Sequence, residues 1–389
     1  MIESRPLADA HSKRYATEPA LFVAPGRVNL IGEHTDYAEG FVFPAAINLA
    51  TLVAISPRDD DRTVIYSENF SVEISFENTA IPASGSGQWY DYPLGVRAVL
   101  AEQGIAIPAF SMSIAGDVPL GSGLSSSASI EVASALAMLH LAGVTLPLLE
   151  IARLCQRAEN NFVGAPCGIM DQFVSACGAA DHALLLDCRS LDYHLAPLPH
   201  DLSLVIINSM VHHSHADGAY KIRRAEVAEG TAALRQLRPS IHALRDATLE
   251  ELASLRPTLR ENVYRRCRHI ISENLRTVAA AAALDAGDLK KIGQLMAEAH
   301  DSYRDDFEAS CPEADLLVEI ASQQPACIGS RLTGGGFGGC TINLVPTPAA
   351  ARFIEQVEAK YLTATGIQAD VYECKAASGA HRIQEIQEE

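Results

Sequence analysis

The sequence has few basic residues and no long hydrophobic run. Lysine and arginine make up 30 of its 389 residues, against 48 aspartate and glutamate residues, so the net charge is −18 at pH 7. A field of this sign repels phosphate backbones and argues against a nucleic-acid or anionic-membrane binder. No apolar run approaches the ~20 residues that cross a bilayer, so we expect no membrane-spanning segment. Any phosphate site must therefore be local, built from backbone amides, a few basic residues and a cation.

Paired cysteines are missing as well. The nine cysteines are scattered with no Cys-x-x-Cys pair, which argues against a disulfide framework or zinc site and favours free thiols in a reducing compartment. Residues 1–20 are polar and of mixed charge, unlike a secretory signal. We therefore predict a cytoplasmic protein. We reject a metal site at His212, His213 and His215, because no cysteine or carboxylate pattern accompanies them.

The common nucleotide-binding and hydrolase motifs do not occur. There is no Gly-Lys-Ser or Gly-Lys-Thr, which excludes a Walker A loop. There is no Asp-Phe-Gly or His-Arg-Asp, which excludes a protein kinase of the usual kind, and no Gly-x-Ser-x-Gly hydrolase elbow. A phosphate site in this chain must use another kind of loop.

One candidate for that loop is the glycine- and serine-rich stretch at 116–131. Gly121 and Gly123 let the backbone approach a ligand closely. Ser125, Ser126 and Ser127 then open an apolar helix that we expect to stop at 143. The first turn of a helix suits a phosphate, and the serine hydroxyls could reach a magnesium ion. By itself the stretch fits an ordinary strand–turn–helix connection equally well, since a glycine-rich loop is weak evidence.

Three further stretches carry candidate chemistry. The segment 26–37 concentrates polar groups between apolar strands, and such groups suit sugar hydroxyls if they are not simply a solvated turn: Arg27, Asn29, Glu33, His34, Asp36 and Tyr37. Asp171, on a short helix, could deprotonate a hydroxyl, and Glu159 could hold magnesium with a serine. In isolation each acid fits a helix-surface or capping role better. A second glycine cluster at 329–339 permits close backbone approach to a ligand or loop.

The chain is long enough for two domains, and we place them at 1–200 and 201–389. In the first half we expect strands at 21–31, 41–55, 63–67, 71–76, 110–114 and 184–187, and helices at 92–103, 125–141, 147–162 and 168–178. In the second we expect strands at 202–208, 328–332, 340–345 and 370–374, and helices at 217–237, 260–284, 288–306, 312–323 and 348–362. Without the helical insertions, the order β–α–β–β–α–β predicts a ferredoxin-like layout in an α+β protein.

Taken together the motifs resemble the GHMP small-molecule kinase family, and within it the galactokinases. Gly26-Arg-Val-Asn-Leu-Ile-Gly-Glu-His-Thr-Asp-Tyr37 is similar to the galactokinase signature. Pro119-Leu-Gly-Ser-Gly-Leu-Ser-Ser-Ser-Ala128 is similar to the phosphate loop of the whole family, and Thr333-Gly-Gly-Gly-Phe-Gly-Gly339 to its third motif. The resemblance implies a ribosomal-protein-S5-like N-terminal domain and a ferredoxin-like C-terminal domain with helical insertions.

The resemblance also implies residue roles. Asp171 would be the base that faces the anomeric hydroxyl of D-galactose, and Arg27 would stabilise the transferring phosphoryl group. Sugar contacts would come from Glu33, His34, Thr35, Asp36, Gly168 and Tyr220. ATP contacts would come from Ser67, Gly121, Ser122, Gly123, Leu124, Ser125, Ser126 and Ser127. Mg²⁺ would be bound by Ser127 and Glu159.

Two positions depart from the family pattern. Gly218-Ala219 stands before Tyr220 where Ser-Glu is expected, and His212 stands where arginine or lysine is common. Both put details of sugar closure in question. The alternatives are a kinase for another galactose-like sugar, such as N-acetylgalactosamine, and a non-catalytic galactose sensor. We expect a monomer with ATP–Mg and galactose as ligands.

Overall fold

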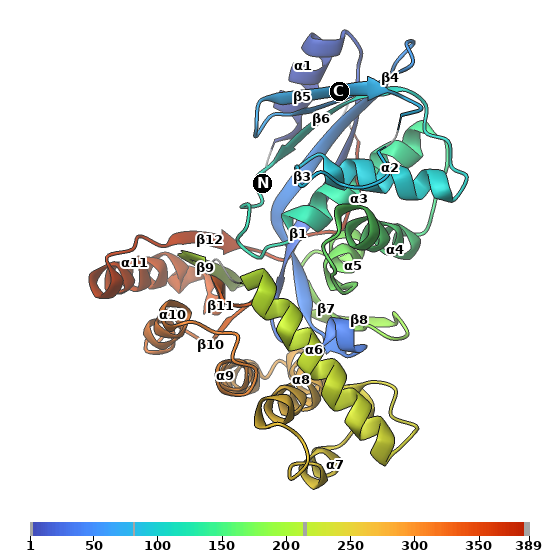
Figure 1. Ribbon diagram of the computed structural model, residues 1–389. Coiled ribbons are helices and arrows are strands. Elements are labelled where there is room, and N and C mark those ends of the chain that lie inside the picture. The colour runs from blue at the N-terminus through green and yellow to red at the C-terminus, as the bar shows by residue number, and fades with distance from the viewer. Residues whose placement is uncertain (1–2, 81, 213–215, 385–389) are drawn as a thin grey trace.

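The computed structural model describes residues 3–80, 82–212 and 216–384 (Figure 1). Its described residues form a six-stranded sheet mainly from the first half of the chain, a four-stranded sheet from the second half, and a small three-stranded sheet. The helical insertions of the second half extend away from the first sheet, at the bottom of the view in Figure 1. The structure confirms the expected α+β class, with helices and antiparallel strands intermixed in both halves.

The first sheet has six strands in the order β13-β1-β3-β6-β4-β5. These strands are β1 (Ala20–Asn29), β3 (Pro44–Pro57), β4 (Arg62–Ser67), β5 (Val72–Glu77), β6 (Phe110–Gly116) and β13 (His381–Ile383). The helices of this half are α1 (Ser4–Tyr15), α2 (Asp91–Glu102), α3 (Ser126–Leu141), α4 (Leu148–Ala158) and α5 (Met170–Cys177). The first strand, β1, contains a bulge between Pro25 and Arg27. Bulges re-aim side chains, and this one precedes the polar turn.

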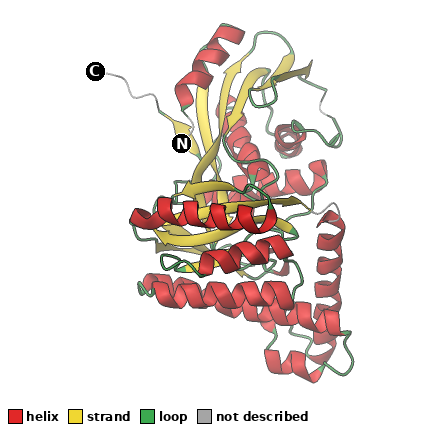
Figure 2. Cartoon of the chain, turned by 90° about the vertical axis from the view of Figure 1, so that its left-hand side faces the viewer, coloured by secondary structure: helices red, strands yellow, loops and turns green. Residues whose placement is uncertain are grey.

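The second sheet has the order β10-β11-β9-β12, and all of its pairs are antiparallel. Its strands are β9 (Leu202–His212), β10 (Gly329–Leu332), β11 (Gly338–Pro346) and β12 (Asp370–Cys374). Its helices are α6 (Ala216–Leu237), α7 (Leu249–Ser254), α8 (Glu261–Asp285), α9 (Leu289–Asp305), α10 (Pro312–Ser322) and α11 (Thr347–Thr365). Figure 2 shows them stacked beside this sheet, with the first sheet above. The predicted ferredoxin-like order is therefore confirmed.

The second sheet is buried on both faces, which explains its continuous apolar strands. Leu204 and Ile206 pack with the residues of α8 and α9, whereas Val205 and Ile207 pack with α10 and α11. Successive strand residues point to opposite faces, so a strand covered on both sides has no polar alternation. This arrangement fixes β10 and β11, which lead into and out of the second glycine cluster.

Several elements escaped the sequence prediction. The helix α1 buries only Leu7 and His11, too few positions to give a helical period. The short elements β8 (Tyr193–Pro197) and α7 were missed too, as was β13, which carries the end of the chain back to β1. With β2 (Phe41–Val42) and β7 (His182–Asp187), β8 forms the small third sheet. Within the described ranges no helix is long and apolar enough to cross a membrane.

A glycine in α9 sets how closely this helix approaches β10. A Cβ atom added at Gly293 would lie 1.8 Å from the carbonyl oxygen of Ile328. Because backbone cannot yield easily, we expect Gly293→Ala to lower the free energy of unfolding by about 2–3 kcal/mol despite the better helix propensity of alanine. Chemical denaturation measures this change.

The matched control is Gly218→Ala in α6, where no atom lies within 4 Å of the added Cβ. That variant should gain about 0.5–1 kcal/mol from helix propensity. Equal stability of the two variants would contradict the close packing of α9 on β10.

Candidate active site

A cavity of about 390 Å³ collects most of the predicted catalytic and sugar-binding residues. Its lining includes Arg27, Glu33, His34, Asp36, Glu159, Gly168, Asp171, Tyr220 and Gly334. These residues come from the polar turn after β1, from α5 and its preceding loop, from α6, and from the second glycine cluster. The fold therefore brings together segments that lie far apart in the sequence.

Arg27 and Asp171 form a bidentate ion pair at this cavity. The Nε and Nη2 atoms of Arg27 donate to the two carboxylate oxygens of Asp171 at 2.8 and 2.7 Å. The Nη1 atom of Arg27 donates to the carbonyl oxygen of Gly123 at 2.5 Å, which ties the pair to the glycine–serine loop. The fork geometry of a guanidinium fixes the carboxylate plane. Asp171 keeps 24% of its side chain exposed, so it remains accessible from the cavity.

Ser125, which we expected to open the helix that follows it, instead supplies a third contact to Asp171. The residue stands at the N-cap position of α3 but has a left-handed backbone, with φ of 61°, and its side chain caps nothing. Instead its hydroxyl donates to Oδ2 of Asp171 at 2.5 Å. The serine therefore orients the acid and does not satisfy the end of the helix.

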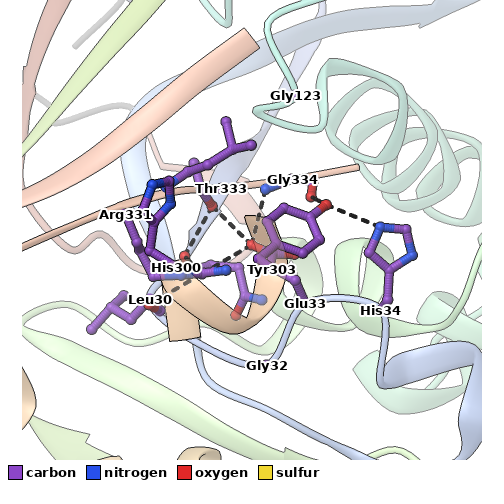
Figure 3. Close-up of polar contacts among 12 residues, drawn as sticks. Leu30, Gly32, Glu33, His34, Gly123, His300, Tyr303, Arg331, Thr333 and Gly334 are labelled. Atoms are coloured by element: carbon purple, nitrogen blue, oxygen red, sulfur yellow. Dashed lines mark hydrogen bonds and ion pairs between the residues drawn. The ribbon is translucent and has the colours of Figure 1, made fainter. Parts of the chain in front are cut away.

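Glu33, in the polar turn, is held by hydrogen bonds from residues of the second glycine cluster at 329–339 (Figure 3). Its Oε1 atom accepts from Nη1 of Arg331 at 3.2 Å, from the Thr333 hydroxyl at 3.1 Å and from the Gly334 amide at 2.9 Å. Arg331 is fully buried and also donates to the carbonyl oxygen of Leu30 at 3.3 Å. The carboxylate is therefore a fixed part of the cavity wall.

Asp36 approaches Gly168 so closely that no side chain fits there. A Cβ atom at Gly168 would lie 1.8 Å from Oδ2 of Asp36. Burial, and then the negative charge of Asp171, raise the pKa of Asp36 to about 6. Among the carboxylates that line this cavity, Asp171 is thus paired with Arg27, whereas Asp36 has no ion-pair partner among the described residues.

The glycine–serine loop borders a second cavity of about 260 Å³. Four of the predicted ATP-binding residues line it, namely Ser67, Gly121, Ser126 and Ser127. The other four do not: Ser122 donates to the Pro119 carbonyl at 2.7 Å, Gly123 accepts from Arg27, Leu124 is buried and Ser125 turns to Asp171. Trp89 and Phe70 also line this cavity and stack at 5.8 Å, which the sequence motifs did not indicate.

Comparison with known proteins covers the whole chain. Three family models match: "Galactokinase galactose-binding signature" at residues 9–57, "GHMP kinases N terminal domain" at 91–179 and "GHMP kinases C terminal" at 280–362. The galactokinase of Roseiflexus sp. (strain RS-1) is 44% identical, with 98% of each chain covered, and that of Chloroflexus aggregans is 44% identical, with 97% covered. The chain belongs to the galactokinase family.

Solved structures agree with this assignment. The Lactococcus lactis galactokinase complexed with galactose is 35% identical and superposes with a TM-score of 0.92, covering 97% of this chain and 99% of the other. The Methanococcus jannaschii mevalonate kinase, at 17% identity, has a TM-score of 0.66 over 93% of this chain and 99% of that one, and so shares the fold alone.

Thr35 is the residue of the predicted sugar set that does not reach the cavity. It is fully buried, and its hydroxyl lies 2.9 Å from the carbonyl oxygen of Gly32 and 2.6 Å from that of Phe41. The threonine of this galactokinase signature therefore closes the turn that carries its neighbours. Of the three histidines at which we rejected a metal site, His213 and His215 lie outside the described residues.

The residues predicted for Mg²⁺ lie together in a buried acidic group. The Ser127 hydroxyl hydrogen-bonds to Glu159, whose pKa is raised to about 7 by burial first and then by Asp171. Gln172 donates to Glu159 at 2.5 Å and to the fully buried Glu131 at 3.1 Å. Oε1 of Glu131 and Oε1 of Gln172 have no partner. Buried carboxylates and unpaired oxygens fit a hard cation with oxygen ligands, although the described residues hold no group of three metal-binding acids, histidines or cysteines.

The approach of Gly168 to Asp36 leads to a structural prediction. In Gly168→Ala the new methyl group must displace the Asp36 carboxylate, and a crystal structure of the variant should show it rotated away from the cavity. Gly335→Ala is the matched control, because Gly335 lines the same cavity, is outside the left-handed region and has no described atom within 4 Å of its added Cβ. An unmoved Asp36 in the Gly168 variant would contradict the contact.

Proposed function

We propose that this protein transfers the γ-phosphoryl group of ATP to the anomeric 1-hydroxyl of D-galactose, giving galactose 1-phosphate and ADP. The observation that carries the proposal is the Arg27–Asp171 pair, which stands in the larger cavity and is tied to the glycine–serine loop through Gly123. A base and a cation are thus fixed beside the loop that the family uses for phosphate.

Asp171 is the proposed base. Phosphoryl transfer needs in-line positioning and charge neutralisation more than covalent help. An anomeric hydroxyl is more acidic than an ordinary alcohol, so the demand on the base is modest. Arg27 and Ser125 hold the carboxylate in one orientation. The guanidinium of Arg27 also offers positive charge to the transferring group.

The sugar is proposed to bind against the polar turn. Carboxylates accept hydrogen bonds from sugar hydroxyls, and both Glu33 and Asp36 line the cavity. Gly168 leaves room for Asp36, and Tyr220 of α6 also lines the cavity. A site built to pair with particular hydroxyls rejects sugars that lack them more strongly than an apolar site can.

The nucleotide is proposed to lie on the glycine–serine loop, with Gly121, Ser126 and Ser127 facing its phosphates and Ser67 nearby. Ser127 and Glu159 would hold Mg²⁺, which supplies charge neutralisation for the phosphate oxygens. The monomeric state, the cytoplasmic location and the division of the chain at 200/201 stay predictions.

The first test is ADP release by the purified protein with ATP and Mg²⁺, offering galactose, N-acetylgalactosamine, glucose and arabinose in parallel. We expect galactose to give the highest kcat/KM. Asp171→Ala should lower kcat by about 10²–10⁴-fold, because it removes the base.

The control for folding is galactose binding by Asp171→Ala, measured as the shift in the melting temperature of the variant when galactose is added. Preference for N-acetylgalactosamine would overturn the substrate but keep the chemistry. Stabilisation by galactose without turnover in the unmodified protein would replace the enzyme with a sensor.

Galactose affinity in the absence of ATP and Mg²⁺ should depend on pH. The pKa of Asp36 is raised to about 6, so this acceptor is charged above pH 6 and protonated below it. A protonated Asp36 loses an acceptor for a sugar hydroxyl. Calorimetric titration should therefore show affinity about tenfold weaker near pH 5 than near pH 7.5.

Titration of two other groups that line the cavity, His34 and Glu159, must be distinguished from titration of Asp36 in that experiment. Burial lowers the pKa of His34 to about 3, so this ring stays neutral throughout the range. Glu159, with a pKa of about 7, is tested with Glu159→Gln, which should keep the same profile. A flat profile in a protein that stays folded would rule out Asp36 as the titrating acceptor.

A further inference from the structure

A buried tyrosine that no sequence motif marks touches both the polar turn and the second glycine cluster. Tyr303 of α9 is fully buried. Its hydroxyl lies 2.9 Å from the carbonyl oxygen of Gly334 and 3.0 Å from Nε2 of His34 (Figure 3). Tyr303 is absent from the cavity lining, and its hydroxyl contacts two residues that belong to it.

The directions of these hydrogen bonds follow from counting protons. The Tyr303 hydroxyl has one proton, and the Gly334 carbonyl can only accept it. The hydroxyl oxygen must then accept from His34, so Nε2 of His34 carries the ring proton. A neutral imidazole has one donor and one acceptor, so Nδ1 accepts from the Tyr37 hydroxyl at 3.0 Å. Tyr303 and the Gly335 carbonyl oxygen, which lies 3.3 Å from Nε2 of His34, therefore both select this tautomer.

The hydrogen bond between Tyr303 and His34 also stabilises a strained backbone at His34. His34 has φ of 62°, in the left-handed region that costs a non-glycine residue about 1–2 kcal/mol. The ring is enclosed by Phe307 at 4.4 Å and by Tyr220 at 5.2 Å between centroids. His34 sits between Glu33 and Asp36 in the chain, so a ring held in one place holds the turn that presents both carboxylates.

We infer that Tyr303 is a positioning residue for the sugar site: its hydroxyl fixes the tautomer and orientation of His34, and through them the turn that carries Glu33 and Asp36. The inference rests on the proposed function, because that function assigns the binding of the sugar to this turn. It assigns Tyr303 no contact with substrate.

The test removes one hydroxyl from each of two buried tyrosines. Tyr361 is the matched control, since it is fully buried and its hydroxyl donates to the Ser209 carbonyl at 2.9 Å, without touching the cavity lining. Tyr303→Phe should raise both the Kd and the KM for galactose by about three- to tenfold, the loss of one hydrogen bond, while kcat changes less than about twofold. Tyr361→Phe should leave all three constants unchanged, and the two variants should lose similar amounts of stability.

A double-mutant cycle asks whether the effect passes through His34. In His34→Asn the side chain keeps an acceptor for Tyr37 but no longer reaches Tyr303. Adding Tyr303→Phe to this variant should change the galactose Kd by less than about twofold. An equal effect in both backgrounds, or an equal effect of Tyr361→Phe, would overturn the inference.

Calorimetric Kd values keep this test separate from the proposed function. If the unmodified protein binds galactose without turnover, the kinase proposal fails, and the cycle still decides the role of Tyr303. If the unmodified protein does not bind galactose at all, both proposals fall.

Discussion

The site depends on one buried ion pair, between Glu33 in the polar turn and Arg331 at the end of β10. Nη1 of Arg331 lies 3.2 Å from Oε1 of Glu33, and the side chains of Glu33 and Arg331 are 3% and 0% exposed. Burying two charges costs about as much as their attraction returns, but losing one partner costs about 3–5 kcal/mol. The pair therefore adds little net stability, yet it prevents the two loops from separating. The polar turn and the second glycine cluster behave as one unit, because moving them apart would leave Glu33 and Arg331 as unpaired buried charges.

The distribution of acids leaves several carboxylates of the site without a positive partner in the described part of the chain. Glu33 is paired with Arg331 and Asp171 with Arg27, whereas Asp36, Glu159 and Glu131 have no ion-pair partner among the described residues. Burial and then the negative charge of Asp171 raise the pKa of Asp36 to about 6 and of Glu159 to about 7. A neutral sugar can bind Asp36 without adding charge, and a nucleotide can approach only with a cation beside it. The net charge of the chain led to the same requirement.

The sequence predicted what is encoded locally. The three motifs and the β–α–β–β–α–β order rest on short spacings and periodicity, and both were found. Contacts made by single hydroxyls were not predictable, because no sequence spacing sets their partners: the Thr35 hydroxyl donates to the carbonyl oxygen of Phe41 in the next strand, and the Ser125 hydroxyl to Asp171 in a distant helix. Tyr303 gave no signal, since a tyrosine in an amphipathic helix fits the core equally well. The strand β13 was missed because three exposed or half-buried residues form no pattern.

Each of the three motifs contains one non-glycine residue in the left-handed region. These residues are His34, Ser125 and Phe337, with φ of 62°, 61° and 61°. Such conformations persist only where surrounding contacts determine them. His34 is held by Tyr303 and Tyr37, Ser125 by Asp171, and the Phe337 amide donates to the Ala309 carbonyl at 2.7 Å. In every case at least one compensating contact comes from another element (Tyr303, Asp171 or Ala309), so the strain is sustained by the assembled fold. The motifs therefore adopt their shapes only together, which explains why each is weak evidence when it stands alone.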